Sequence, residues 1–245
     1  MRSMLVTGAG AGIGEAVARA AAAAGFRVGV ADIDAEAASE VAADLPDAVA
    51  LPLDVTAADE VRATLAAFGD LDVVVNNAGI LRTGPLIDHD VADFRRVMEV
   101  NINAVFIVAQ AAAQRMAAGN GGVIINMASI NGLTPSPNSG AYGTAKAGVI
   151  ALTRQMAIEW GALGIRVNAI APGFVDAGMS TPFYADDAIR ERRSQAVPVG
   201  RLASAQDIAD AALFLSSEQA SYVSGHTLTV DGGVVHSVLA QLPRD

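Results

Sequence analysis

Tyr142 and Lys146 are the residues whose types and spacing most clearly suggest chemistry. Lys146 is the only lysine of the chain, because fifteen of the sixteen Lys and Arg residues are arginine. The pair stands four positions apart in a segment predicted to be helical, so the two side chains share one face. A nearby ammonium lowers the pKa of a phenol, which at about 10 is otherwise a poor base at neutral pH. The pair therefore predicts a tyrosine that serves as general acid or base.

Ser129 comes thirteen residues before Tyr142, at the end of an apolar run. In an open parallel sheet the carboxyl ends of the strands face the ligand crevice. A hydroxyl at such an end can donate to a carbonyl oxygen as negative charge develops there. Taken alone, Ser129 would be an ordinary loop serine. The prediction that it donates to a substrate oxygen therefore depends on Tyr142 being close to it.

A glycine-rich turn follows the first apolar run and opens the first helical segment. The sequence TGAGAGIG (7–14) has glycine at positions 8, 10, 12 and 14, and Ile13 breaks the strict G-x-G-x-x-G spacing. Such a turn brings bare backbone and a helix N-terminus close to a pyrophosphate. The turn therefore predicts a dinucleotide site that includes Gly8, Gly10, Gly12 and Gly14.

Asp32 ends the second apolar run, eighteen residues after Gly14. An acid at this distance accepts hydrogen bonds from the adenosine ribose hydroxyls, and it would repel a 2′-phosphate. Neither Ala11 nor Ile33, which stand where a basic residue would attract that phosphate, is basic. The residues favour NAD over NADP as the cofactor. Asp54, at the end of the third run, is placed to reach the adenine.

Seven apolar runs rich in β-branched residues must position these groups. These runs are apolar on both faces, which is typical of parallel strands buried between helix layers, and Ala-rich segments of helical length separate them. The expected strands are 4–7, 27–32, 49–54, 71–76, 123–129, 165–172 and 226–230, and expected helices include 14–25, 35–45 and 57–68. The alternation predicts an α/β fold with a doubly wound parallel sheet and helices on both faces. SAQD (204–207) predicts a capping box, and 173–203 reads as a lid without a strand.

The bulk composition limits the classes of partner. A chain of 245 residues fits one larger α/β domain or two small ones, and a net charge of −10 argues against nucleic acid and anionic membranes. The chain has no cysteine, and its three histidines, 89, 226 and 236, have no metal-ligand spacing. The first apolar run starts at Met4, which leaves no room for a signal peptide, so we expect a soluble cytoplasmic protein.

Over essentially its whole length the chain resembles the short-chain dehydrogenase/reductase family. The matching motifs are TGAGAGIG (7–14), DV (54–55), NNAG (76–79), VNINAVF (100–106), INMAS (125–129), YGTAK (142–146), IRVNAIAPG (165–173) and VDGG (230–233). Their joint order is highly specific. The resemblance implies one Rossmann-type domain over 1–245, a seven-stranded sheet ordered 3-2-1-4-5-6-7, a lid at about 174–203, and a homotetramer or homodimer, of which we expect the homotetramer.

The resemblance also implies roles for single residues. Tyr142 would be the general acid/base, Lys146 would lower its pKa and hold the nicotinamide ribose, and Ser129 would polarise the substrate oxygen. Asn101 would hold a water that links Lys146 to solvent. The implied cofactor site comprises Gly8, Gly10, Gly12, Ile13, Gly14, Asp32, Ile33, Asp54, Val55, Asn76, Ala78, Gly79, Tyr142, Lys146, Pro172, Gly173 and Val175. For Asn76 and Asn77 the alternative is that they only brace a strand end.

One position departs from the family. Four residues after Gly173 the family often has a threonine that contacts the nicotinamide carboxamide, whereas this chain has Ala177. Ser180 or Thr181 is available to replace that contact.

These observations predict reversible hydride transfer between NAD and a secondary alcohol or ketone. Residues 80–83, 130–140, Phe174 and the segment 177–198 are expected to form the substrate pocket, with small or apolar side chains including Leu133, Pro135, Pro137, Met179 and Phe183. No arginine is clearly aimed into this pocket, since Arg190, Arg192 and Arg193 alternate with acids as on a solvated helix. We therefore expect a neutral, moderately apolar substrate such as a cyclic alcohol, a dihydrodiol or a steroid-like alcohol.

Two alternatives remain open. A 3-oxoacyl-carrier-protein reductase has the same reactive residues, but it usually takes NADPH and has a basic patch for its acidic carrier. A non-catalytic NAD-binding sensor on the same fold would not need a tyrosine with a lowered pKa. The tail 234–245 either packs at a subunit interface or is a plain disordered end.

Overall fold

Seven strands form one parallel sheet in the computed structural model, which describes residues 1–237. The strands are β1 (Ser3–Thr7), β2 (Arg27–Asp32), β3 (Ala48–Pro52), β4 (Val73–Asn76), β5 (Gly122–Met127), β6 (Ile165–Pro172) and β7 (Thr227–Val230). Their order is β3-β2-β1-β4-β5-β6-β7 and neighbouring strands pair in parallel, which confirms the predicted α/β fold. Central strands are buried on both faces, as their continuous apolar runs predicted.

Two strands end earlier than their apolar runs. The third run was expected to end at Asp54 and the fifth at Ser129, but β3 ends at Pro52 and β5 at Met127. The ladder between β2 and β3 stops at the pair of Asp32 with Pro52, because β2 itself ends there. Asp54 and Ser129 consequently lie in loops just beyond the strands.

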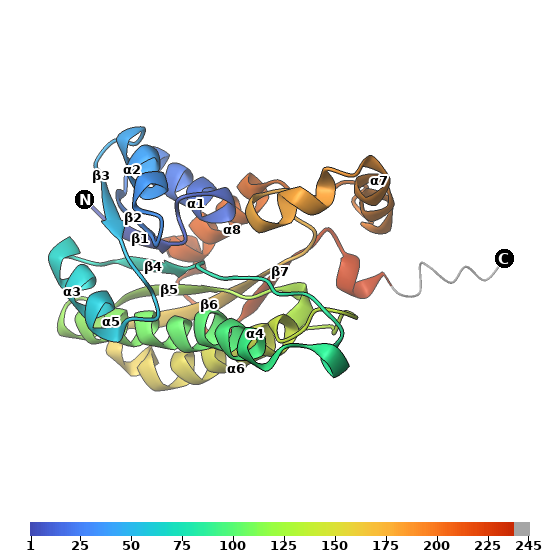
Figure 1. Cartoon of the computed structure of the whole chain (residues 1–245). Coiled ribbons are helices and arrows are strands. Elements are labelled where there is room, and N and C mark those ends of the chain that lie inside the picture. Colours follow the sequence, from blue (N-terminus) through green and yellow to red (C-terminus); the bar gives the residue numbers. More distant parts are fainter. Residues whose placement is uncertain (238–245) are drawn as a thin grey trace.

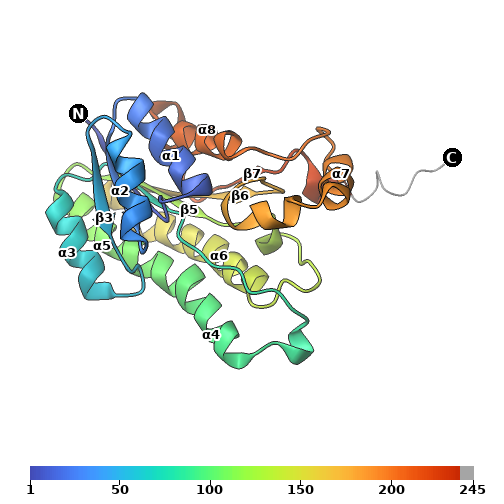
Figure 2. The same ribbon diagram turned by 45° about the horizontal axis from the view of Figure 1, so that its top comes forward.

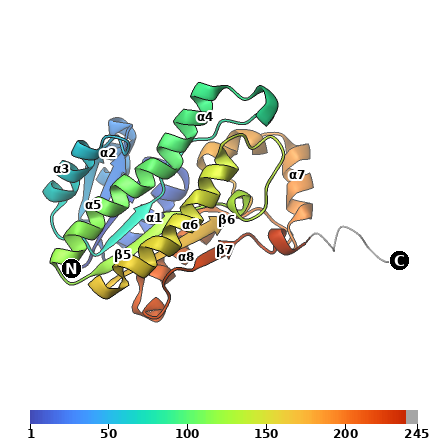
Figure 3. The same ribbon diagram turned by 90° about the horizontal axis from the view of Figure 1, so that it is seen from below.

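Helices cover both faces of the sheet (Figure 1). Helices α1 (Gly12–Ala23), α2 (Ala35–Ala43) and α8 (Ala205–Ser216) cover one face, and α3 (Ala58–Phe68), α5 (Ala104–Ala118) and α6 (Tyr142–Trp160) cover the other, as Figure 3 shows from below. Alternate residues of β1 pack into the hydrophobic cores on opposite faces of the sheet. Met4 and Val6 join the core under α1 and α8, whereas Leu5 joins the core under α3 and α5.

Helix α4 (Val91–Met98) runs through a π-helical turn, Glu99–Asn103, directly into α5. The continuous stretch Val91–Ala118 is 28 residues long and has a window with the mean hydropathy of a membrane span, 1.2, but 56% of that window is buried inside the fold. A core helix has the same length and composition, so this stretch is weak evidence for a membrane span.

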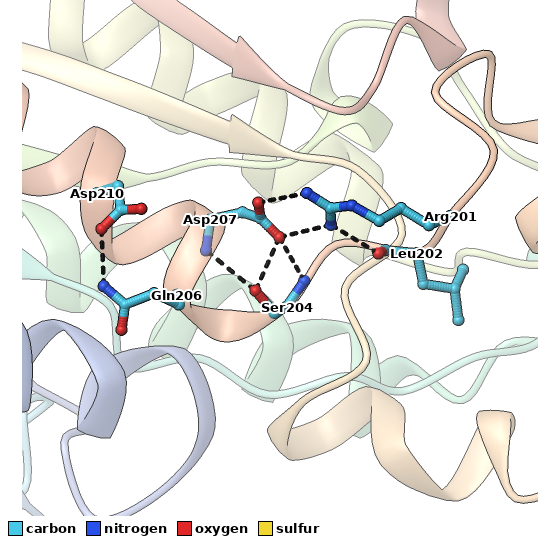
Figure 4. Close-up of polar contacts among 6 residues, drawn as sticks. All are labelled: Arg201, Leu202, Ser204, Gln206, Asp207 and Asp210. Carbon is cyan, nitrogen blue, oxygen red and sulfur yellow. Dashed lines mark hydrogen bonds and ion pairs between the residues drawn. The ribbon is translucent and has the colours of Figure 1, made fainter.

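Helix α8 begins with the predicted capping box (Figure 4). The Ser204 hydroxyl accepts from the Asp207 N–H, and the Asp207 carboxylate accepts from the Ser204 N–H at 2.7 Å. Arg201 adds a two-pronged contact to the same carboxylate, at 2.7 and 2.8 Å, and holds the pKa of Asp207 well below its usual range. Helices α2, α4 and α7 (Asp187–Ala196) begin instead with the aspartate caps Asp34, Asp90 and Asp186.

The segment 173–203 carries no strand and contains a 3₁₀ stretch, Gly178–Tyr184, and helix α7 (Asp187–Ala196), which lie beyond the carboxyl ends of the strands (Figures 1 and 2). Two arginines expected on a solvated helix fold back onto this segment. Arg190 pairs with Asp176 at 2.7 Å, and Arg193 donates to the Tyr184 hydroxyl at 3.2 Å and lies over the Phe174 ring. Of the tail 234–245, for which a subunit interface and a disordered end were the two alternatives, residues 238–245 lie outside the described residues.

Candidate active site

A cleft of about 410 Å³ opens at the carboxyl ends of the central strands. Most of the predicted residues line it: Gly8, Gly12, Ile13, Asp32, Ile33, Asp54, Val55, Ala78, Gly79, Ser129, Tyr142, Lys146, Pro172, Gly173 and Val175. Four of the predicted residues do not line it, namely Gly10, Gly14, Asn76 and Asn101. The cleft is where a doubly wound sheet is expected to bind a dinucleotide.

The turn after β1 presents bare backbone to this cleft. Helix α1 begins at Gly12, and its N-cap residue, Ala11, gives no side-chain hydrogen bond to the first turn. Gly8 and Gly12 have φ angles of +63° and +61°, and a Cβ on Gly8 would come within 2.8 Å of the Ala78 Cα. Free N–H groups at a helix N-terminus bind phosphates, so the turn fits the pyrophosphate of a dinucleotide.

Gly10 and Gly14 do not line the cleft, but they allow the turn to pack closely against its neighbours. A Cβ on Gly14 would lie 2.0 Å from the Gly8 carbonyl oxygen and 2.6 Å from the Asn77 amide nitrogen. The Gly10 N–H donates to Asp32 Oδ2 at 2.8 Å. Both glycines therefore permit close packing of the turn, and the cofactor contact expected of them stays a prediction.

Asp32 is the last residue of β2, as predicted, and its carboxylate is held in place by backbone groups. Oδ2 accepts from the Gly10 N–H and Oδ1 accepts from the Asp34 N–H at 3.0 Å. Each oxygen can accept a further hydrogen bond. The carboxylate thus fits the ribose hydroxyls of an adenosine.

The part of the cleft around Asp54 contains a charged residue, Arg96, that the sequence reasoning missed. Asp54 accepts from the hydroxyl and the N–H of Thr56, and these two hydrogen bonds lower the pKa of its carboxyl. The guanidinium of Arg96, which also lines the cleft, lowers it further. The sequence carries no signal that separates Arg96 from its neighbour Arg95, because only the packing of α4 turns one of them to the cleft.

Tyr142 is the first residue of α6, which places its side chain and that of Lys146 on one face of the helix. The Lys146 Nζ lies 5.5 Å from the centre of the Tyr142 ring. Burial raises the pKa of the phenol, and the neighbouring Ser129 hydroxyl lowers it in part. The lowered pKa that we expected from Lys146 is therefore not found, because desolvation of the phenolate outweighs the other contributions.

Ser129 lies next to Tyr142 in the loop after β5. It caps a short 3₁₀ turn, where its hydroxyl oxygen accepts from the Asn131 N–H at 3.1 Å. A hydroxyl that accepts from the backbone keeps its own proton for donation. Ser129 can consequently donate to an oxygen bound in the cleft.

Lys146 is buried, with 3% of its surface exposed. Its Nζ donates to the Met127 carbonyl oxygen at 2.7 Å, which leaves two of the three ammonium donors for other partners. Burial lowers the pKa of Lys146 to about 8. At neutral pH the side chain therefore remains mostly charged.

This pKa predicts a pH-dependent stability difference between the wild type and a Lys146→Met variant. Between pH 8 and 10.5 the unfolded lysine holds its proton more strongly than the folded one, so the wild type gains stability as the pH rises. The gain relative to the variant is expected to reach about 3 kcal/mol at most, at about 1.4 kcal/mol per pKa unit. Urea unfolding of both proteins from pH 7 to 10 measures it, and parallel pH profiles would contradict the assignment.

Asn101 lies behind the wall of the cleft, in the π-helical turn. Its Oδ1 accepts from the Ile80 N–H at 3.1 Å, and its Nδ2 donates to the Ile80 carbonyl at 2.8 Å. A Cβ on Gly79 would lie 2.6 Å from the same Oδ1. The side chain thus fixes the segment that passes Lys146, and the water relay stays a prediction.

The cofactor contact expected of Asn76 is not supported. Its buried Nδ2 donates to Asn126 Oδ1 at 2.8 Å, and Asn126 donates in turn to the Thr153 hydroxyl. These contacts are those of the strand-bracing alternative. Asn77, by contrast, lines the cleft and donates to the carbonyls of Thr7 and Gly8, so it braces the glycine turn as well.

A second cavity of about 290 Å³ adjoins the cleft and shares Gly79, Ile80 and Met179 with it. It contains the predicted pocket residues 80–83 and Phe183. The expectation that no arginine faces the pocket is wrong, because Arg82 lines this cavity. Phe174 lies elsewhere, in a separate cavity beside Arg201 and Asp207.

A doubly wound sheet with a glycine turn after β1 and an acid at the end of β2 is typical of dinucleotide-binding proteins, and Ser129, Tyr142 and Lys146 in the same cleft fit an oxidoreductase that uses the dinucleotide. The comparisons with known proteins agree with this class. A family profile described as enoyl-(acyl carrier protein) reductase matches residues 8–235. The chain belongs to the short-chain dehydrogenase/reductase family and is an oxidoreductase acting on CH–OH groups.

Relatives within the family differ in their substrates. The chain is 44% identical over 241 residues to cis-4-hydroxycyclohexanecarboxylate dehydrogenase of Sinomonas cyclohexanicum, covering 95% of this chain and 96% of the relative. It is 36% identical to a 3-oxoacyl-[acyl-carrier-protein] reductase of Chlamydia muridarum, covering 95% and 97%. A solved gluconate 5-dehydrogenase of Burkholderia cenocepacia, in complex with NADP and tartrate, superimposes with a TM-score of 0.92 at 35% identity, covering 97% and 96%.

Proposed function

We propose that this protein interconverts a cyclic secondary alcohol and its ketone with NAD(H), and that Tyr142 is the general acid/base. The observation that carries the proposal is the meeting of Ser129, Tyr142 and Lys146 in the same cleft as Asp32 and the glycine turn. The 44% identity to a hydroxycyclohexanecarboxylate dehydrogenase supports a ring-shaped substrate. Apolar side chains of Ile80 and Met179 beside the reactive residues support it as well.

Each reactive residue has a task that its contacts allow. The bound nicotinamide would accept hydride during oxidation and supply it during reduction. Tyr142 takes the hydroxyl proton of the alcohol in the first direction and returns it in the second. Ser129 donates to the substrate oxygen. The charge of the Lys146 ammonium offsets part of the desolvation that raises the pKa of the Tyr142 phenol, and its remaining donors hold the cofactor ribose. We also propose the relay role for Asn101, which lies against Gly79 next to Lys146.

The first experiment measures NADH or NADPH formation with purified protein against cyclic, diol, sugar and steroid alcohols. Turnover of cyclic alcohols with NAD is the expected result. Turnover confined to NADP and 3-oxoacyl substrates would favour the carrier-protein reductase instead. Tight NAD binding without turnover of any alcohol would favour a non-catalytic sensor.

The preference for NAD is a separate part of the proposal, since a related solved structure contains NADP. What supports NAD is the carboxylate of Asp32, which lines the cleft beside the exposed, uncharged Ile33. An Asp32→Asn change keeps the shape and one acceptor but removes the charge that repels a phosphate. We expect the ratio of kcat/KM for NAD to that for NADP to fall about tenfold or more, because tenfold corresponds to about 1.4 kcal/mol.

Asp34→Asn is the matched control for this change. Asp34 is a carboxylate two residues further on, which caps α2 and does not line the cleft, and asparagine caps a helix about as well. The cofactor ratio should stay within about twofold of the wild type. A wild type that prefers NADP, or an equal effect of both changes, would overturn the role of Asp32.

We propose that 174–203 acts as a lid over the cleft. Support comes from Ala177, Gly178, Met179 and Ser180, which line the cleft at the start of the 3₁₀ stretch. Of the two replacements considered for the missing threonine, Ser180 lines the cleft and Thr181 does not. Ser180 is therefore the proposed contact to the nicotinamide carboxamide.

We also propose that the protein is a cytoplasmic homotetramer. Support for self-association comes from an apolar groove that Ile102, Phe106 and Leu152 line. It lies on the face of the sheet where Figure 3 shows α5 and α6 side by side. Phe106 is 41% exposed, although it is a large apolar side chain. Light scattering after size exclusion tests the oligomeric state.

A further inference from the structure

We propose that Arg82 binds a carboxylate on the substrate, so that the preferred alcohol is a hydroxy acid whose apolar ring separates the reacting carbon from the anion. This inference rests on the proposed function and names the substrate class of the same site. It replaces the expectation of a neutral substrate. Arg82 would act as a specificity-determining residue, and the proton transfer would remain with Tyr142.

The cavity beside the cleft has the composition that such a substrate needs. Its walls include the apolar side chains of Ile80, Leu81, Met179 and Phe183. Arg82 is the single charged side chain among its described lining residues. A pocket with apolar walls and one cation accommodates an apolar ring that ends in an anion.

Two sets of contacts hold the backbone of Arg82 in place. On one side, the Asn101 side chain bonds both the N–H and the carbonyl of Ile80. On the other side, Gly84 donates its N–H to the Asn138 carbonyl at 2.9 Å. The same residue forms an isolated parallel bridge with Ser139, three residues before Tyr142. The chain carrying Arg82 is thus tied to the segment that leads into the general acid/base.

The loop packing brings Arg82 close to the start of α6 as well. A Cβ on Gly140 would come within 2.7 Å of the Arg82 carbonyl oxygen and 2.6 Å of the His89 ring. Gly140 has a φ angle of +56°, so the close approach and the backbone conformation both require glycine there. Arg82 is therefore placed by a rigid scaffold, which is what a selective binding residue needs.

The guanidinium keeps donors free for a ligand. Nη1 donates to the Leu81 carbonyl at 3.1 Å. The ion pair of Nε with Asp93 Oδ1 is long, at 3.6 Å, which exceeds hydrogen-bond distance. The side chain lines the cavity and is 53% exposed, so its remaining N–H groups are accessible to a ligand. Its planar fork matches the two oxygens of a carboxylate.

The test compares a charged and a neutral alcohol of the same shape, 4-hydroxycyclohexanecarboxylate and 4-hydroxycyclohexanecarboxamide. In an Arg82→Gln variant we expect kcat/KM for the carboxylate to fall about tenfold to hundredfold, as for the loss of a charge-assisted hydrogen bond. The value for the carboxamide should stay within about twofold. An Asp93→Asn variant, which removes the competing acid, should lower KM for the carboxylate.

Arg62→Gln supplies the matched control. Arg62 is an arginine of similar exposure, 55%, that pairs with Asp59 on α3 and lines none of the cavities described above. Its replacement should leave kcat/KM for both alcohols unchanged. If Arg82→Gln lowers kcat/KM equally for both alcohols, or for neither of them, the carboxylate site is overturned. The proposed oxidoreductase function would still stand.

Calorimetry with cyclohexanecarboxylate separates the site from the reaction. Binding to the wild type that is lost in Arg82→Gln would support the site even if neither alcohol is turned over, in which case only the proposed function fails. Absence of binding to the wild type would overturn the site.

Discussion

Replacement of Tyr142 by phenylalanine is expected to lower kcat at least about a hundredfold, because general acid–base catalysis typically contributes a hundredfold or more. The variant loses the phenolic O–H but keeps the ring, which packs against Val97, Ala141 and Ala145. We therefore expect the free energy of unfolding to stay within about 1 kcal/mol of the wild type, as for a replacement that leaves no large cavity. Steady-state kinetics with a cyclic alcohol measures the loss, and calorimetry with NAD checks that the cofactor still binds.

Tyr222→Phe is the control for the loss of a tyrosine hydroxyl. Tyr222 is fully exposed and does not line the cleft, so its variant should retain wild-type kcat. Activity of Tyr142→Phe within about tenfold of the wild type would remove Tyr142 from the chemistry, since a tenfold loss is less than an acid–base residue supplies.

Gly14→Ala is expected to have the second large effect, on cofactor binding and on stability together. The added Cβ would lie 2.0 Å from the Gly8 carbonyl oxygen and 2.6 Å from the Asn77 side chain, so the turn must shift away from helix α1. Overpacking of this kind costs about 1–3 kcal/mol of folding free energy. Because the same turn forms the phosphate site, we expect the Kd for NAD to rise at least about tenfold, which is about 1.4 kcal/mol.

Gly161→Ala is the matched control, because it also adds a single Cβ to a glycine. Gly161 has helical backbone angles, with φ −58°, and an added Cβ would meet nothing within 4 Å. Alanine there should stabilise the fold by about 0.5–1 kcal/mol and leave NAD binding unaltered. Calorimetry and urea unfolding measure both variants, and equal behaviour of the two would contradict the packing role of Gly14.

The proposed substrate-binding residue Arg82 and the proposed general acid/base Tyr142 are supported by connected segments of the chain. Ile80 and Gly84, which flank Arg82, are held by Asn101 and by the segment before Tyr142. The substrate pocket and the general acid/base are thus built on one scaffold. A substrate that is held at Arg82 is positioned relative to Tyr142 by that scaffold, which is how binding energy remote from the reacting atoms favours a reaction.

The sequence by itself predicted features that depend on local patterns. The runs of β-branched residues identified all seven strands, SAQD predicted the capping box at Ser204, and the spacing of Tyr142 and Lys146 predicted a shared helix face. These features follow from periodicity and from contacts within a few residues, which the order of residues already contains. The strand order came from the family resemblance, and the structure confirmed it.

Only the tertiary structure decided which side chains reach the cleft and in what electrostatic state. It turned Asn76 into a strand brace, brought Arg96 and Arg82 to the walls of the cavities, and let burial raise the pKa of Tyr142. Neighbouring positions such as Arg95 and Arg96, or Asn76 and Asn77, carry the same residue type. They differ only in the direction that helix and strand packing imposes on them. Burial and charge depend in the same way on residues far apart in the chain, so they are properties of the assembled fold.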